Sequence, residues 1–214
     1  MPAKRARGAD TPLVAVYADE SCLGNGREGE NPGGAGGLIE IARGDGLVRR
    51  DYWISESATT NNRMALRSVI ESFRALSRKG KQFSVVFTSD SRYLIDGMTQ
   101  WVRDWARRGW TRKSGPIENL ELWHAAVDAV RGHEVEWRWV RGHHGHPQNE
   151  YANHLATSAA ATQTASDGLV DSQFEQWLAS QRERGAVRAE IDEFPTGERF
   201  KPAAPLPVVS TGRP

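Results

Sequence analysis

Two acidic residues stand directly after apolar runs that are typical of buried strands. Asp19 follows the run from Leu13 to Ala18, and Asp90 follows the run from Val85 to Ser89. Either acid alone is more simply interpreted as a turn residue, because Asp is common in turns. A strand that ends in an acid, found twice, instead predicts a sheet that presents two carboxylates side by side.

Paired carboxylates without a thiolate or an imidazole cluster favour hard cations such as Mg²⁺ or Mn²⁺. Two divalent ions held in this way form the kind of site that hydrolyses phosphodiesters. Three histidines that stand close together, His143, His144 and His146, resemble a zinc site. Partner cysteines are lacking and the intervening residues favour a loop, so the sequence predicts Mg²⁺ or Mn²⁺ rather than zinc.

The composition is that of an ordinary globular protein. Its 214 residues are enough for one domain and a tail, and the net charge is +1. A single cysteine excludes an internal disulfide and makes a cytoplasmic location the simpler expectation. The first seven residues are basic, but no long apolar segment follows, which argues against a signal peptide or a membrane span.

Apolar periodicity and turn residues predict both strands and helices. The predicted strands are 13–20, 35–42, 47–55, 83–88 and 134–140, with a turn at 31–34 before the second one. The predicted helices are 60–78, 91–97, 98–107, 117–130 and 147–161. Three successive strands followed by helices that alternate with two more strands imply a mixed sheet with helices on its faces.

The chain divides into four segments by composition. Residues 1–11 are expected to be disordered, and residues 12–162 to form the domain. Residues 163–194 are expected to be a partly helical extension. Residues 195–214 are expected to be a disordered tail, because they are rich in Pro and Gly.

A basic stretch rich in tryptophan lies in the second half of the predicted domain. Its cations are Arg103, Arg107, Arg108, Arg112 and Lys113, and they are interleaved with Trp101, Trp105 and Trp110. Cations clustered among aromatic residues suit a nucleic-acid backbone. The alternative is a solvated amphipathic helix whose tryptophans belong to the core, and the sequence leaves both interpretations open.

Several motifs together resemble type 1 ribonuclease H. They are the two strand-end acids, the segment 59–66, the segment 90–93, the tryptophan-rich stretch and the segment 139–156. The resemblance runs from about Val14 to about Ala161. It implies an α/β, ribonuclease H-like fold, in which a five-stranded mixed sheet carries helices on both faces and strands one, four and five are adjacent and parallel.

The same resemblance implies an activity. Members of this family cleave the RNA strand of RNA–DNA hybrids endonucleolytically with two Mg²⁺ or Mn²⁺ ions. The expected partner is therefore an RNA–DNA hybrid and not a membrane, and the expected oligomeric state is a monomer.

The four metal-binding positions of the family fall on Asp19, Ala65, Asp90 and Asn153. The family has Glu at the second position and usually Asp at the fourth, so this chain keeps only two of the four carboxylates. Fewer charged ligands predict weaker metal binding and reduced activity. Changing Ala65 to Glu is then expected to raise cleavage by at least about 100-fold.

Ala65 leaves several alternatives open. It is either an introduced substitution or the natural residue of a degenerate homologue, and the chain is then either an impaired enzyme or a catalytically inactive hybrid-binding module. Glu71 lies six positions on and points elsewhere at about 100° per residue. Glu20 reaches the site only if its strand has already ended. An integrase- or transposase-like protein is less favoured, because the tryptophan-rich stretch and the Gly-His-His-Gly loop would not be expected there.

The resemblance also assigns the remaining site residues. His143, in a loop rich in glycine, is expected to help proton transfer or product release. The residues expected to line the minor groove of the hybrid are Cys22, Asn25, Asn61, Asn62 and Arg92. Thr60, Asp104 and Trp105 fall on the family's DNA-phosphate pocket, and Trp101 lies in the same basic stretch. Helix capping is the alternative role for the segment 60–62.

Overall fold

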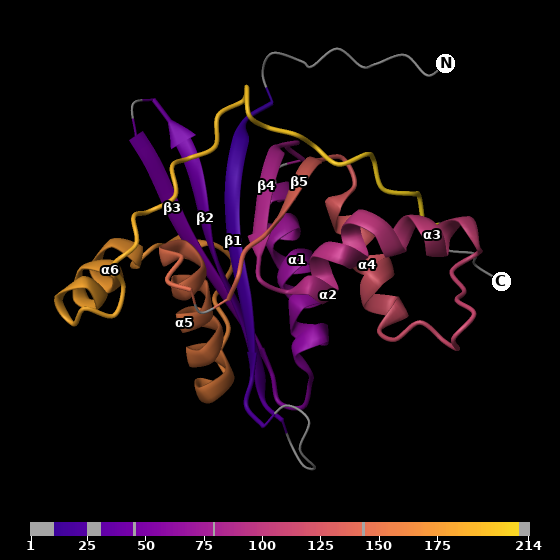
Figure 1. Ribbon diagram of the computed structural model, residues 1–214, viewed down its shortest axis with the longest axis horizontal. Coiled ribbons are helices and arrows are strands. Elements are labelled where there is room, and N and C mark those ends of the chain that lie inside the picture. The colour runs from indigo at the N-terminus through magenta and orange to yellow at the C-terminus, as the bar shows by residue number, and fades with distance from the viewer. Residues whose placement is uncertain (1–10, 25–30, 45, 79, 143, 210–214) are drawn as a thin grey trace.

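The protein is described by a computed structural model, which covers residues 11–24, 31–44, 46–78, 80–142 and 144–209 (Figure 1). The described residues form a mixed sheet of six strands in the order β5-β4-β1-β2-β3-β6. The strands are β1 Leu13–Cys22, β2 Gly33–Arg43, β3 Gly46–Glu56, β4 Ser84–Ser89, β5 Glu134–Trp139 and β6 Val170–Asp171. The predicted fold class is confirmed, with the short β6 as an addition to the five predicted strands.

The helices cover both faces of this sheet (Figure 1). They are α1 Asn61–Ser77, α2 Arg92–Asp96, the π-helical turn η1 Gly97–Trp101, α3 Val102–Arg107, α4 Leu120–Val130, α5 Pro147–Thr162 and α6 Phe174–Glu183. The larger hydrophobic core lies between the sheet and α1, with α4 outside it, and the smaller core lies on the α5 side with α6. No described helix is long and apolar enough to cross a membrane.

Strands β1, β4 and β5 are adjacent and parallel. Ala18 of β1 lies opposite Ser89 of β4, and Ser89 lies opposite Trp139 of β5. Because parallel strands end at the same edge of a sheet, the residues that follow them are brought together there. This edge carries the acidic residues that the sequence singles out.

The glycine-rich start of β2 allows α5 to lie directly on the sheet. The predicted turn at 31–34 is shorter than expected, because β2 already begins at Gly33. A Cβ atom at Gly34 would lie 2.5 Å from the backbone nitrogen of Ala160, and one at Gly36 would lie 2.5 Å from Cβ of Leu155. Only glycine permits so close an approach of two backbones. These positions therefore set the height of α5 above the sheet.

The segment after α5 is part of the folded structure. Strand β6 pairs with β3, and α6 buries Phe174 and Leu178 in the smaller core. The Pro- and Gly-rich composition predicts disorder from residue 195 onward, whereas residues 195–209 pass the start of β5 on their way to α3 (Figure 1).

Two observations explain why the residues from 195 to 209 hold this path. The backbone N–H of Ala203 donates to the carbonyl of Val135 on β5 at 2.8 Å. Val209, at 7 % exposure, reaches the larger core. Backbone pairing with an edge strand and one apolar anchor are tertiary contacts that local composition does not encode. Residues 210–214 lie outside the described residues.

We predict that Gly34→Ala destabilises the protein by about 1–3 kcal/mol, because the added methyl group must push α5 away from β2. The free energy of unfolding in urea measures this change. Gly46→Ala is the matched control, since a Cβ there meets no atom within 4 Å, and it should be neutral or slightly stabilising. Equal effects of the two substitutions would contradict the close packing of α5.

Candidate active site

Three carboxylates meet at the edge of the sheet where the parallel strands end. Asp19 and Glu20 lie on β1, and Asp90 follows the end of β4. One potential ligand atom from each of the three lies within 4.8 Å of the others. The structure thus brings together the two acids that the sequence singles out and adds Glu20 to them.

Glu20 reaches the cluster because β4 ends before β1 does. The last residue pair between the two strands is Ala18 with Ser89, whereas β1 continues along β2 to Cys22. The side of β1 next to Asp19 and Glu20 is therefore free of a neighbouring strand. The N–H of Glu20 donates to Oδ1 of Asp19 at 2.7 Å. Side chains from opposite faces of β1 can meet around this open side.

Ala65, the position of the expected helix carboxylate, is a core residue. Its side chain is fully buried in the same hydrophobic cluster as Ala18, on the α1 side of the sheet. Side chains alternate along a strand, so Glu20 projects to the same side as Ala18. The carboxylate of Glu20 therefore comes from the strand on the face that α1 covers, and the methyl group of Ala65 offers no ligand atom.

Helix α5 contacts the cluster through Asn149. Its side-chain amide donates from Nδ2 to Oδ2 of Asp19 at 3.0 Å, and the residue is only 2 % exposed. Asn153, the position singled out by the resemblance, lies one turn further along the same face of α5, where its Oδ1 accepts from Thr157 at 3.4 Å. The motif pattern does not single out Asn149, although its spacing of four residues from Asn153 places both on one face of α5.

The other side of the cluster is formed by the segments after β4 and β5. The indole of Trp139 donates to the carbonyl of Asp90 at 3.0 Å, and the guanidinium of Arg92 lies over the Trp139 ring at 3.7 Å from its centre. A side chain at Gly142 would collide with Oδ2 of Asp90, so glycine lets this loop pass close to the acid. The next residue, His143, lies outside the described residues.

The cluster is electrostatically unfavourable as long as it holds only carboxylates. Burial raises the pKa of Asp19 to about 8, and the negative charge of Asp90 adds to this effect. Burial and the charges of Asp19 and Asp90 raise the pKa of Glu20 well above its usual value. Close carboxylates with raised pKa values are suited to bind a divalent cation. The cation would replace the protons and neutralise the charge that their loss creates.

The polar residues at the start of α1 cap the helix and also line a cavity. The Thr60 side chain accepts from the N–H of Arg63 at 3.3 Å and caps the helix. Thr60, Asn61 and Asn62 also line a cavity of about 380 Å³ with Arg63, Glu118 and Asn119. Nearby, the Cys22 thiol donates to the carbonyl of Thr59 at 3.4 Å. Asn25 lies outside the described residues.

The tryptophan-rich stretch likewise combines a core with a charged rim. Trp101 and Trp105 pack against the buried Trp123. They line a second cavity, of about 400 Å³, and the residues that line it with them are Tyr93, Arg108, Arg112, Lys113, Ser114, Ile117 and Glu118. Glu118 borders both cavities, so the two adjoin. Asp104 forms a surface ion pair with Arg107.

The sequence of this chain matches that of known ribonucleases. A family model of RNase H matches residues 11–161. A ribonuclease H of Novosphingobium aromaticivorans is 41 % identical over 148 residues, which are 69 % of this chain and 96 % of that protein. A ribonuclease H of Pseudomonas entomophila is 43 % identical over 144 residues, which are 67 % of this chain and 90 % of that protein.

Solved structures agree with this match. The crystal structure of LC9-RNase H1, described as a type 1 RNase H with the type 2 active-site motif, is 66 % identical with a TM-score of 0.89, and covers 96 % of this chain and 98 % of its own. The solution structure of the PFV RNase H domain, at 15 % identity and a TM-score of 0.59, shares the fold over 72 % of this chain and 97 % of its own. The chain belongs to the RNase H family and is a ribonuclease H.

Proposed function

We propose that this ribonuclease H hydrolyses the RNA strand of RNA–DNA hybrids with two divalent cations, Mg²⁺ or Mn²⁺, held by Asp19, Glu20 and Asp90. The observation that carries the proposal is the cluster of three carboxylates within 4.8 Å at the edge of the sheet. Such ions make a water nucleophilic and stabilise the leaving oxygen of a phosphodiester.

Glu20 takes the place of the carboxylate that is missing at position 65. The expectation of reduced activity depends on a count of two carboxylates, and Glu20 raises that count to three. The description of LC9-RNase H1 as a type 1 enzyme with a type 2 active-site motif supports a rearranged ligand set within this family. We therefore infer a fully active enzyme, in which Ala65 serves the core and needs no replacement.

The remaining polar residues orient this ligand set. The Asn149 side chain donates to Oδ2 of Asp19, and the backbone N–H of Glu20 donates to Oδ1, so both oxygens of this carboxylate are held in place. The Asn153 amide, on the same face of α5, is a neutral ligand in this proposal. His143 follows Gly142 next to Asp90 and moves protons or aids product release.

The two adjoining cavities are the proposed contacts to the hybrid. A hybrid is recognised through its shape and its 2′-hydroxyl groups across a wide minor groove. In this proposal the side-chain amides of Asn61 and Asn62 hydrogen-bond in the minor groove of the hybrid. Cys22 and Arg92 contact the same groove. The cavity next to Trp101 and Trp105 offers Arg108 and Arg112 to phosphates. A monomeric state and a cytoplasmic location stay predictions.

We predict that Glu20→Gln lowers the rate of hybrid cleavage by more than about 100-fold, because it removes one of three charged ligands. Ala65→Glu should give no gain, because the position it would supply is already filled. Single-turnover cleavage of a labelled hybrid in excess Mg²⁺ measures both rates. Glu183→Gln, at the exposed end of α6, is the control and should cleave like the unaltered chain.

Two outcomes would contradict this ligand assignment. A gain of about 100-fold for Ala65→Glu, with no loss for Glu20→Gln, would restore the assignment made from the sequence. If the unaltered chain binds the hybrid but does not cleave it with Mg²⁺ or Mn²⁺, it is a hybrid-binding module and not a hydrolase.

We predict that the metal-free protein loses stability as the pH rises from about 4 to 8. The unfolded Asp19 ionises near its usual pKa, whereas the folded one holds its proton up to a pKa of about 8, so ionisation over this interval favours the unfolded chain. At pH 8, Asp19→Asn should therefore be more stable than the unaltered chain by more than about 1 kcal/mol.

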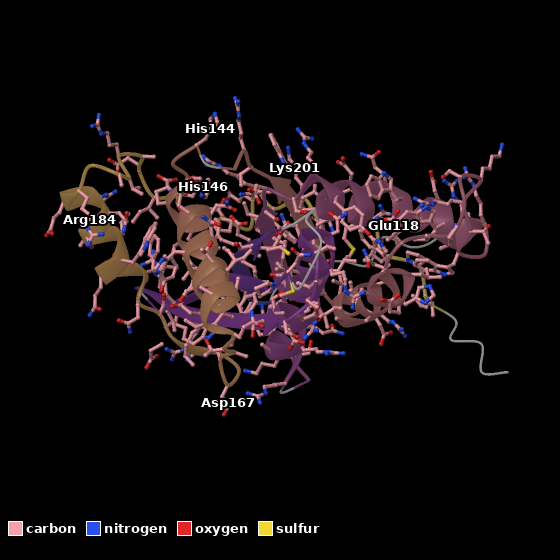
Figure 2. The ribbon with its side chains drawn as sticks, turned by 90° about the horizontal axis from the view of Figure 1, so that it is seen from below. Glu118, His144, His146, Asp167, Arg184 and Lys201 are labelled. Atoms are coloured by element: carbon pink, nitrogen blue, oxygen red, sulfur yellow. The ribbon has the colours of Figure 1, made fainter. Side chains whose placement is uncertain are left out.

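Thermal unfolding with EDTA at pH 5 and at pH 8 measures this difference. The exposed Asp167 supplies the control, because Asp167→Asn should change stability equally at both pH values (Figure 2). Adding Mg²⁺ should raise the Tm of the unaltered chain at pH 8 and leave that of Asp19→Asn almost unchanged. If the metal-free unaltered chain gains stability relative to Asp19→Asn between pH 5 and pH 8, the raised pKa of Asp19 is contradicted.

We predict that the double variant Arg108→Ala and Arg112→Ala flattens the salt dependence of hybrid binding. Each lost phosphate contact should reduce the slope of log affinity against log salt by about 0.9 or less. The control is Arg184→Ala, because Arg184 and Glu118 lie at opposite ends of the molecule (Figure 2). An unchanged slope for the double variant would remove the second cavity from the proposed interface.

A further inference from the structure

The segment that follows α6 is hydrogen-bonded to the first turn of α5. The Gln148 side chain donates from Nε2 to the carbonyl of Asp192 at 3.0 Å, and its Oε1 accepts from the N–H of Asp192 at 3.2 Å. Gln148 is fully buried. One side chain that bonds both backbone groups of one residue fixes the place of Asp192 beside the N-terminus of α5.

From that place the Asp192 carboxylate holds His146. Nδ1 of His146 accepts from the N–H of Asn149 at 3.3 Å, and Nε2 lies 2.9 Å from Oδ2 of Asp192. A ring nitrogen that accepts carries no proton, so these contacts assign the proton of a neutral His146 to Nε2, from which it is donated to Asp192. A carboxylate partner of this kind fixes both the tautomer and the orientation of an imidazole.

His146 connects this contact to the acid cluster. It is the N-cap of α5, and the residue whose N–H it accepts, Asn149, donates its side-chain amide to Asp19. His146 also packs on the Tyr17 ring, with 5.7 Å between ring centres, on the same face of β1 as Asp19. Figure 2 places His146 near His144, at the loop that leads from β5 into α5. The contacts thus run from Asp192 through His146 and Asn149 to Asp19.

Other contacts anchor the extension without the Asp192 side chain. Phe174, Leu178 and Val187 are buried in the smaller core, and Arg50 pairs with Asp171. Asp192 itself is half exposed, at 53 % for its side chain. Folding of the extension therefore does not depend on the Asp192 carboxylate, whereas the orientation of His146 does.

We propose that Asp192 is a positioning residue: through His146 and Asn149 it fixes the N-terminal turn of α5 against Asp19, so that the C-terminal extension sets the geometry of the carboxylate cluster. The proposal rests on the proposed function of that cluster. The extension lies beyond residue 161, where the match to the family model ends. In this proposal the extension therefore stabilises the site from outside the part of the chain that the family model matches.

The test uses the full chain with Asp192→Ala, Asp192→Asn and Glu190→Ala. Glu190 is the matched control, since it lies two residues away, is almost fully exposed and pairs only loosely with Arg182, at 3.7 Å. Single-turnover cleavage of a saturating hybrid is followed over a Mg²⁺ titration, together with the KM for hybrid and the Tm. The ring ¹⁵N signals of His146 report its tautomer directly.

For Asp192→Ala we expect a fall of about tenfold in the cleavage rate and a higher half-saturating Mg²⁺ concentration, because lost orientation of a metal site typically costs 10- to 100-fold. The KM for hybrid should stay the same. His146 should populate both tautomers. Asp192→Asn should recover most of the rate, because its amide oxygen can still accept from Nε2. Glu190→Ala should match the unaltered chain in every readout.

An unchanged rate, Mg²⁺ dependence and tautomer in Asp192→Ala would overturn the proposal. So would a loss of rate that disappears when the variant is assayed at the same interval below its Tm as the unaltered chain, because that is a purely structural effect. If Asp192→Ala does not fold, Asp192→Asn decides: an altered tautomer without an altered Mg²⁺ dependence refutes the positioning role. An unaltered chain that does not cleave hybrids would refute the proposed function instead.

Discussion

Mutual repulsion among three close carboxylates, of which Asp19 is buried and the other two are half-buried, is the interaction on which the rest of this structure depends. Asp19, Glu20 and Asp90 approach within 4.8 Å. Burial, together with the charges of the neighbouring carboxylates, raises the pKa of Asp19 and of Glu20, which shows the cost of placing these acids here. Such a cluster persists only when the surrounding fold fixes it, and it becomes favourable only when a cation neutralises it. The metal-free protein is therefore expected to be less stable than it would be without this cluster, whereas the proposed metal ions would make the cluster favourable.

Three features of the fold fix the cluster. The parallel strands β1 and β4 end at one edge, and β4 ends first, which frees the side of β1 that carries Asp19 and Glu20. Glycines of β2 let α5 lie directly on the sheet. The N-terminal turn of α5 then points a hydrogen-bond donor, Asn149, at Asp19. The positive end of the helix dipole lies at this turn and favours the negative charge.

The sequence predicted the elements that depend on local pattern. Apolar runs closed by an acid identified the strands that carry Asp19 and Asp90, and the order of elements with the family resemblance predicted the parallel neighbours. It leaves Glu20 open as an alternative that depends on where a strand ends, because alternation along a strand places neighbouring residues on opposite faces. Only the end of β4, a feature of the assembled sheet, lets both side chains meet.

Other differences between the predicted and the observed structure also arise from tertiary contacts that the local sequence does not encode. The sequence predicts a turn at Gly33 and Gly34, whereas both belong to β2, and Gly34 lies against the backbone of α5, a contact that exists only in the assembled fold. The segment from 195 to 209 has the composition of a disordered tail, but a backbone hydrogen bond from Ala203 to β5 and the buried Val209 hold it. Asn149 and Asn153 share one helix face, and the sequence alone does not show which of them contacts Asp19.

We propose above that Glu20, and not a residue of α1, completes the metal site of this ribonuclease H. Anomalous diffraction from crystals soaked in Mn²⁺ tests it most directly. We expect Mn²⁺ peaks between Asp19, Glu20 and Asp90. A Glu20 oxygen should lie within about 2.5 Å of an ion, or should accept a hydrogen bond from a water bound to that ion. Mn²⁺ bound to Asp19 and Asp90, with Glu20 turned away from the ion, would contradict it.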